Sequence, residues 1–379
     1  MPTHALTTAQ EVEDFVRGLT LLGTGGGGRP DSGRDFLMGH VKAGKPIGWA
    51  DLEVIPDDAW VCSAFYMGSV APRGTNFDPR RRWPEFGETR VEQPLVSAVE
   101  ELEAYVGVEI SALVAFELGA ANTAGPMDAA ARLGILMMDG DAAGRAVPEL
   151  VQAYPFICGK EFCPASICDQ WGNVLLMKKT ASGHVAEMLG KMVSTVTKKP
   201  DPYAYCGFAG FLSRAGEMKK TIIPGTLTQS LEIGLAIREA RVRSEEPVAA
   251  AVQALKGWLL FQGEVVGKDW EDKDGYLCGT TTIQGVNGFQ GHMLRVWIKN
   301  ENHISWLDGS PFVCSPDLIM IVELGTAEPI INTNLKPGQQ VAVLGKANRL
   351  YRSRDGLQAL GPCHFGFDID YVPIEELVA

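Results

Sequence analysis

A short acidic stretch, Asp139 to Glu149, carries the residue types in this sequence that are best suited to catalysis. Asp139 and Asp141 are followed by Arg145 and then by Glu149. Carboxylates held close together raise one another's pKa, so that one can take a proton from water, or they can bind a cation. A guanidinium group can hold a substrate carboxylate or stabilise developing negative charge. We therefore predict Asp139, Asp141 and Glu149 to be catalytic and Arg145 to bind substrate. The alternative is that either aspartate only caps the following helix.

A glycine-rich run between residues 23 and 28 is a second candidate site. Apolar spacing predicts helices on both sides of it, so it lacks the strand that precedes a dinucleotide-binding loop. It also lacks the Gly-Lys-Ser/Thr ending of a P-loop, and we therefore expect no nucleotide. The run is either a sharp turn or a loop that presents backbone N–H groups to a polar ligand. On the second interpretation Gly25, Gly26 and Gly27 bind substrate.

No metal-binding motif is written locally in the sequence, because none of its six histidines forms a His-x-His or His-Glu-x-x-His pair. His184 begins a predicted helix, where the helix dipole favours a neutral imidazole that can bind a metal. We consider zinc held by His184 and Asp141 as one hypothesis and a surface position for His184 as the other. Cys158, Cys163 and Cys168 are spaced too widely for a typical zinc site, and we expect them to be buried thiols.

The elements that must position these residues alternate between strand and helix in the first half of the chain. Strands are predicted at 59–67, 113–118 and 135–138, with helices at 95–105 and 127–133. This order is typical of a parallel sheet covered by helices, whose ligands bind at the carboxyl ends of the strands. Ser69, Glu117 and Asn122 follow the first two strands, so we expect them to bind substrate in one cleft with the acidic stretch.

The second half of the chain has a different character, with runs of β-forming residues from about residue 258 onward. We predict an α/β N-terminal domain with a mainly parallel sheet at residues 1–165. A C-terminal β-rich (α+β) domain follows at residues 166–379, with a helical insertion near 183–257. No Gly-x-Ser-x-Gly nucleophile elbow is present, which disfavours a serine hydrolase.

Composition narrows the setting in which this protein works. The formal net charge of -12 disfavours a nucleic-acid partner, which usually requires a clustered basic face. No apolar segment approaches the roughly 18–20 residues that span a bilayer, so we expect no membrane association. The N-terminal residues do not resemble a signal peptide, and eight cysteines are too few for a disulfide scaffold in a chain of 379 residues. We expect a cytoplasmic protein.

Six motifs in the sequence, taken together, resemble one family. They are 22–28, 117–122, 139–149, 300–302, 316–319 and 361–371. The family was first described as a domain of unknown function and was later named for S-methyl-thiohydantoin desulfurase. Its members often accompany hydantoin-utilisation enzymes. The sequence departs from the family pattern at Ala120 and Ala142, where glycines are common.

The resemblance implies a two-part protein that hydrolyses a small heterocyclic substrate. On this basis we expect a hydrolase acting on a hydantoin-like or thiohydantoin-like cyclic imide, in which activated water cleaves a C–S or C–N bond. The alternative is a non-catalytic ligand-binding or accessory subunit of a hydantoin-type hydrolase. We further expect a homo-oligomer.

Overall fold

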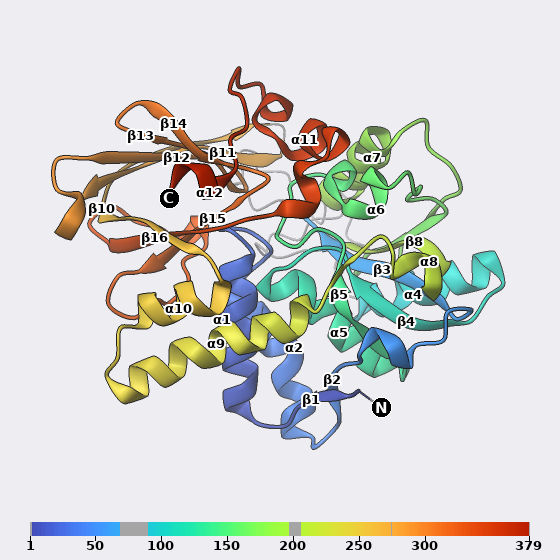
Figure 1. Cartoon of the computed structure of the whole chain (residues 1–379). Coiled ribbons are helices and arrows are strands. Elements are labelled where there is room, and N and C mark those ends of the chain that lie inside the picture. Colours follow the sequence, from blue (N-terminus) through green and yellow to red (C-terminus); the bar gives the residue numbers. More distant parts are fainter. Residues whose placement is uncertain (1, 69–89, 197–205, 274, 379) are drawn as a thin grey trace, which may run out of the picture.

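The computed structural model describes residues 2–68, 90–196, 206–273 and 275–378 (Figure 1). Two seven-stranded sheets form the body of the protein, and a short two-stranded sheet pairs β1 (His4–Leu6) with β2 (Ile47–Trp49). No helix within these ranges is both long enough and apolar enough to cross a membrane.

The first sheet has a parallel core of three strands, as the alternation of strand and helix predicts. Strands β3 (Trp60–Met67), β4 (Ile110–Ala115) and β5 (Leu136–Asp141) lie side by side and run parallel. Helices α4 (Pro94–Val106) and α5 (Ala120–Leu133) lie between them in the chain. Most residues of the three strands are buried, because a parallel core is covered on both faces. The α/β fold class is confirmed.

Antiparallel strands extend this sheet on both sides, so that the sheet as a whole is mixed. The full order is β7-β6-β8-β3-β4-β5-β9. The added strands are β6 (Ala165–Cys168), β7 (Val174–Met177), β8 (Cys206–Arg214) and β9 (Ile223–Pro224). The sequence patterns do not predict β8, which pairs with β3 across a long chain separation. All four of these antiparallel strands lie at residues 165–224. The first sheet is therefore built from both the predicted N-terminal part and the chain beyond residue 165.

The second sheet is antiparallel throughout and confirms the predicted β-rich C-terminal part. Its order is β14-β13-β12-β11-β10-β16-β15. The strands are β10 (Trp258–Lys273), β11 (Tyr276–Gly285), β12 (Met293–Lys299), β13 (Glu301–Leu307), β14 (Ser310–Cys314), β15 (Leu318–Glu323) and β16 (Gln340–Lys346). Side chains that alternate along these strands fill a separate apolar core on one face of the sheet.

Helices join the two sheets into one body (Figure 1). Helix α1 (Ala9–Leu22) begins at a capping box formed by Thr8 and Glu11, and α2 (Pro30–Lys42) follows the glycine-rich run. Helix α9 (Thr226–Arg243) packs along α1, and Gly18 permits this close approach because a Cβ there would lie 1.7 Å from a backbone oxygen of α9. The other α-helices of the described residues are α6 (Tyr154–Ile157), α7 (Gly183–Val196), α8 (Ala215–Met218), α10 (Pro247–Leu255), α11 (Arg354–Leu360) and α12 (Ile374–Leu377).

Candidate functional site

Arg145 lies fully buried at the junction of the two sheets and connects three distant segments of the chain. Its Nη2 atom donates to Oγ1 of Thr24 in the glycine-rich run at 2.9 Å and to the backbone oxygen of Asn302 on β13 at 2.7 Å. Its Nη1 atom is buried without a hydrogen-bond partner among the residues that the structure describes. Burial lowers the pKa of Arg145 to about 10, and the neighbouring Glu301 opposes that shift. The guanidinium therefore stays charged at neutral pH.

Glu117 follows β4, at the strand end where the sequence places it, and its side chain is turned inward. The side chain is 5% exposed. Oε1 accepts a hydrogen bond from Nδ2 of Asn122 at 2.6 Å, and Oε2 accepts one from the backbone N–H of Val147 at 2.7 Å. Burial raises the pKa of Glu117 to about 7 against the opposing effect of these two bonds. This carboxyl group can therefore exchange a proton near neutral pH. Asn122 lies in the first turn of α5 and orients Glu117.

Glu301 and His303 complete a buried polar cluster with Arg145 and Glu117. They alternate with Asn302 on β13, so both side chains project from the same face of the second sheet. Oε2 of Glu301 lies 4.0 Å from Nε2 of His303, and neither atom has a hydrogen-bond partner in the described parts of the chain. Burial and the nearby Glu117 raise the pKa of Glu301 well above its usual value, and burial lowers the pKa of His303 well below its own. We call these four residues the Arg145 cluster.

Residues 300–302 stand out in the sequence only through the family resemblance, which assigns them no chemistry. A Glu-x-His pair on a strand is a weak local signal, since most such pairs lie on a solvated face. What distinguishes Glu301 and His303 is complete enclosure, with exposed fractions of 4% and 0%. This burial results from packing against the other sheet, so the local sequence does not predict it.

Asp141 is fully buried at the end of β5 and is not part of these contacts. Its Oδ1 accepts hydrogen bonds from the backbone N–H groups of Ala143 and Gly144, the former at 2.7 Å. Its Oδ2 has no partner among the described residues. Burial raises the pKa of Asp141 to about 7, although the backbone bonds and the charge of Lys346 oppose the shift. Asp141 therefore holds the turn that leads to Arg145 while keeping one free oxygen.

Asp139 caps a helix, although not the one that follows it in the chain. Oδ1 accepts hydrogen bonds from the backbone N–H groups of Leu227 and Thr228, and Oδ2 accepts one from the Thr228 hydroxyl at 2.6 Å. These are donors of the first turn of α9, which otherwise lack partners within the helix. Both oxygens are thus engaged, and a catalytic role for Asp139 stays a prediction.

Glu149 forms an ionic contact with the second sheet. Its Oε1 pairs with Nζ of Lys299 on β12, and its Oε2 lies 3.2 Å from Nε2 of His364. Burial alone would raise the pKa of Glu149, but the hydrogen bonds from His364 and Lys299 outweigh it and lower the pKa to about 2. Glu149 is therefore ionised at neutral pH and is a poor base, since its proton affinity is too low.

The glycine-rich run connects the sheets through its backbone. The carbonyl of Gly25 accepts from the N–H of Asn332 at 2.8 Å, and the carbonyl of Gly27 accepts from the N–H groups of Ala121 and Asn122 at 3.2 Å. These last two donors belong to the first turn of α5 and are therefore not presented to a ligand. Gly26 lies directly against Glu301. The predicted helix-to-helix loop is confirmed, and substrate binding by its glycines stays a prediction.

The residues predicted to bind zinc lie in different surroundings. His184 is exposed at the start of α7, whereas Asp141 is fully buried. Across the described ranges, only His4, Asp51 and Asp139 form a group of three ligand-type side chains with atoms within 4.8 Å. That group lacks both His184 and Asp141, and its Asp139 oxygens already accept hydrogen bonds from α9. The residues proposed for zinc do not fit the ion together. Ser69 lies outside the described residues.

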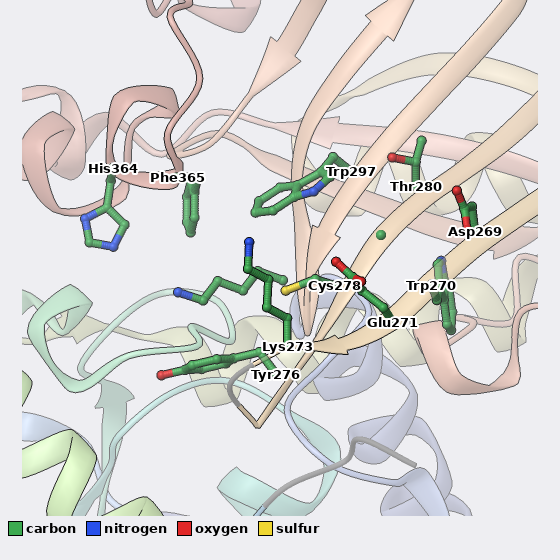
Figure 2. A pocket seen from close by; sticks show the side chains of 12 residues that line it. Asp269, Trp270, Glu271, Lys273, Tyr276, Cys278, Thr280, Trp297, His364 and Phe365 are labelled. Carbon is green, nitrogen blue, oxygen red and sulfur yellow. The ribbon is translucent and has the colours of Figure 1, made fainter. Parts of the chain in front are cut away.

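A cavity of about 480 Å³ opens on the second sheet beside the Arg145 cluster (Figure 2). Strands β10, β11 and β12 and the turn at Pro362–Phe365 line it. The lining residues are Asp269, Trp270, Glu271, Lys273, Tyr276, Cys278, Gly279, Thr280, Trp297, Lys299, His364 and Phe365. The ring of Phe365 also packs on the ring of His303, with centroids 4.2 Å apart. The cavity and the cluster therefore share a wall.

Two family models match the chain, one over its N-terminal part and one over its C-terminal part. The family model described as "S-Me-THD-like, N-terminal domain" matches residues 10–179, and that described as "S-Me-THD-like, C-terminal domain" matches residues 188–374. A crystal structure of a protein from Chromobacterium violaceum is similar with a TM-score of 0.74 and 21% sequence identity, over 98% of this chain and 100% of that one. At that identity the likeness shows the fold. No curated protein matches the chain.

Proposed function

Because the chain belongs to the S-Me-THD-like family, we propose that it is a hydrolase acting on a hydantoin-like or thiohydantoin-like ring. The observation that carries this proposal is the enclosed Arg145 cluster. Two carboxyl groups with raised pKa values flank a buried guanidinium there, and three polar atoms lack partners among the described residues. Buried polar groups are normally paired, so three unpaired ones on neighbouring side chains support a polar ligand between them.

Glu117 is the group we assign to water activation. Its pKa of about 7 gives it a useful proton affinity at neutral pH, where a general base is most effective. Asn122 and Val147 fix both oxygens by one hydrogen bond each, and each oxygen retains a second lone pair for water. Glu117 takes a proton as the water oxygen bonds to the ring carbon that carries sulfur or nitrogen.

Glu301 is the group we assign to protonation of the leaving atom. Burial and the nearby Glu117 raise its pKa well above the usual value, which favours the protonated carboxyl group, the form that can donate a proton. The C–S bond breaks as sulfur accepts this proton and leaves as a thiol, and the remaining proton of the added water moves from oxygen to the ring nitrogen as the ring carbon becomes a carbonyl. Water has then replaced one thiol, and the proton on Glu117 restores that on Glu301 through solvent.

Arg145 and His303 fit the polar atoms of a cyclic imide. The free Nη1 atom of Arg145 can donate to a ring oxygen on which negative charge develops, and such charge is strongly stabilised in an enclosed site. His303 is neutral because its pKa is lowered, and its free Nε2 can form a hydrogen bond with a ring atom. A planar ring that offers both N–H and C=O groups would satisfy these atoms at once.

Asp141 is the second candidate for water activation. Its pKa is also raised to about 7, and its Oδ2 is free of partners in the described chain. Glu117 is favoured because its charge acts directly on Glu301 within the cluster. Comparing Glu117→Gln with Asp141→Asn separates the two assignments, since only the base should be required for turnover.

The test is a turnover assay of the purified protein on a panel of hydantoins, thiohydantoins and S-methylated thiohydantoins. We expect Glu117→Gln and Glu301→Gln each to lower kcat by about 10²-fold or more, as loss of a general acid or base does. Glu232→Gln, which alters an exposed carboxylate on α9, is the matched control. Parallel assays with a chelator and elemental analysis test the zinc hypothesis.

Two results would contradict the proposal. Absence of turnover across the whole panel would remove the enzymatic assignment, and tight binding without turnover would instead favour an accessory, ligand-binding role. Equal activity of wild type, Glu117→Gln and Glu301→Gln would place the reaction outside the Arg145 cluster.

A further inference from the structure

The cavity and the Arg145 cluster lie on one face of the second sheet. Strand pairing places Cys278 opposite Lys299, and Lys299 opposite Glu301. Directly opposite residues of antiparallel strands project from the same face. Cys278 and Lys299 line the cavity, and Glu301 belongs to the cluster. The cavity floor therefore continues, one strand further on, into the enclosed site.

Two aromatic side chains line the cavity and also contact the Arg145 cluster. Trp297 and Phe365 line the cavity, and their rings lie 5.6 Å apart between centroids. The centroid of His303 lies 6.3 Å from that of Trp297 and 4.2 Å from that of Phe365. A group attached to a ring held at His303 and Glu301 would pass these two side chains on its way into the cavity. Figure 2 shows Trp297 and Phe365 on one side of the cavity and Tyr276 on the other.

The chemistry of the walls selects for a neutral, flat group. Four aromatic residues line the space, namely Trp270, Tyr276, Trp297 and Phe365. Two of these rings already carry ammonium groups: Lys268 Nζ lies 3.4 Å from the centroid of Trp270, and Lys299 Nζ lies 4.3 Å from that of Tyr276. A second cation would be repelled there. Trp297 and Phe365 contact other aromatic rings, which is the environment that a further ring prefers.

The charged residues of the lining give the cavity no net preference for an ion. Asp269 and Glu271 contribute two negative charges, and Lys273 and Lys299 contribute two positive ones. These four formal charges cancel. The volume of about 480 Å³ is within the usual range for small-ligand pockets, roughly 300–1,000 Å³, and far exceeds what a methyl group requires.

We propose that this cavity binds the ring substituent of the substrate and that it selects neutral aromatic substituents. The inference rests on the proposed function in one respect, which is that the heterocycle occupies the Arg145 cluster. It adds the class of substrate: hydantoin-like rings that bear a benzyl or similar arylmethyl group. Trp297 and Phe365 determine this specificity by packing against the aryl ring.

Binding of two probes, measured by titration calorimetry, tests the proposal independently of turnover. The probes are 5-benzyl and 5-methyl S-methyl-2-thiohydantoin, which share the heterocycle and differ only in the substituent. We expect the wild-type protein to bind the benzyl probe at least tenfold more tightly. Trp297→Leu and Phe365→Leu should each reduce this preference to below threefold. Trp306→Leu, which alters a tryptophan of the same sheet outside the cavity lining, should retain it.

The outcomes separate this inference from the proposed function. Equal affinity for the two probes, or a preference that persists in folded Trp297→Leu and Phe365→Leu, overturns the cavity assignment even if both probes are hydrolysed. A tenfold preference that both substitutions abolish supports it, even if neither probe is turned over and the hydrolase assignment fails. Circular dichroism confirms that each variant is folded before its affinity is compared.

Discussion

Gly26 and Glu301 lie so close together that a Cβ atom on the glycine would be 1.9 Å from Oε1 of Glu301. The contact joins the glycine-rich run of the first half of the chain to β13 of the second sheet. Backbone hydrogen bonds from Asn302 to Thr24 and from Asn332 to Gly25 hold the two segments at this separation. Glycine at position 26 therefore leaves room for a carboxyl group of the Arg145 cluster, which a larger residue would displace.

The first prediction follows from this contact. Gly26→Ala forces Glu301 to move in a site where it is 4% exposed and has little room. Overpacking of this kind typically costs about 1–3 kcal/mol, so we expect the free energy of unfolding to fall by that amount. Turnover should fall as well, because the carboxyl group is displaced.

The matched control for this substitution is Gly39→Ala in α2, where a Cβ would meet nothing within 4 Å. Because alanine favours helix over glycine, we expect that variant to be at least as stable as wild type. Denaturant titration of both variants provides the measurement. Equal stability of Gly26→Ala and wild type would show that Glu301 is not held in place.

The second prediction concerns the pH dependence of stability through Asp141. Its pKa is raised from 3.8 to about 7 in the folded protein, so the fold favours the protonated form. Its contribution to stability is fully present below about pH 4 and is lost as pH rises through about 7. The loss is on the order of 4 kcal/mol. Asp141→Asn should remove this pH-dependent part while keeping the acceptor for Ala143 and Gly144. If the free energies of unfolding of wild type and Asp141→Asn changed in parallel from pH 4 to pH 8, this prediction would be wrong.

The third prediction has the opposite sign and concerns Glu149. Its pKa is lowered to about 2, so its contact with Lys299 and His364 stabilises the fold above about pH 4.5 and is lost as pH falls through about 2. We expect Glu149→Gln to cost about 1–3 kcal/mol at pH 7 and progressively less toward pH 2.

Glu217→Gln is the comparison for this effect. Glu217 also has a lowered pKa through Lys220 and Lys160, but it is exposed, and solvent screens such pairs. Its substitution should change stability little at any pH. Thermal unfolding monitored across the pH range tests both variants. If Glu149→Gln and Glu217→Gln lowered the free energy of unfolding equally at pH 7, burial of the Glu149 contact would contribute nothing to stability.

The fourth prediction distinguishes capping from catalysis at Asp139. Asp139→Ala removes the acceptor for the first turn of α9 and should cost about 1–2 kcal/mol, as loss of a helix cap does. Asp139→Asn keeps an oxygen acceptor and should be close to wild type in stability and in turnover. A stable Asp139→Asn variant that has lost turnover would instead establish a catalytic carboxylate.

The fifth prediction is the pH dependence of turnover. If the ionised form of Glu117 activates water, kcat/KM should rise with pH through an apparent pKa of about 7, which is the pKa of this group in the free protein. Conversion to Gln should abolish that rise in whatever activity remains. A flat profile for wild type between pH 5 and pH 9 would exclude Glu117 as the base.

Local sequence patterns were sufficient to predict the parallel core, the helix-to-helix glycine loop and the β-rich second half. Periodicity of apolar residues depends on neighbours along the chain, and Thr8, for example, caps α1 through a residue three positions away. The same patterns placed Glu117 at the end of a strand. They did not predict β8, because its pairing with β3 depends on residues far away in the chain.

Only the tertiary structure decided which of the candidate side chains meet. Arg145 contacts Asn302 across 157 positions, and Asp139 caps a helix that begins 87 residues later. The surroundings then give the carboxyl groups different pKa values. Burial raises the pKa of Glu117 and Glu301, whereas Lys299 and His364 lower that of Glu149. The sequence determined the residue types and the strand ends that carry them. Solvent exclusion and charge partners come from distant segments, and for that reason the fold alone decided which carboxyl groups can exchange protons at neutral pH.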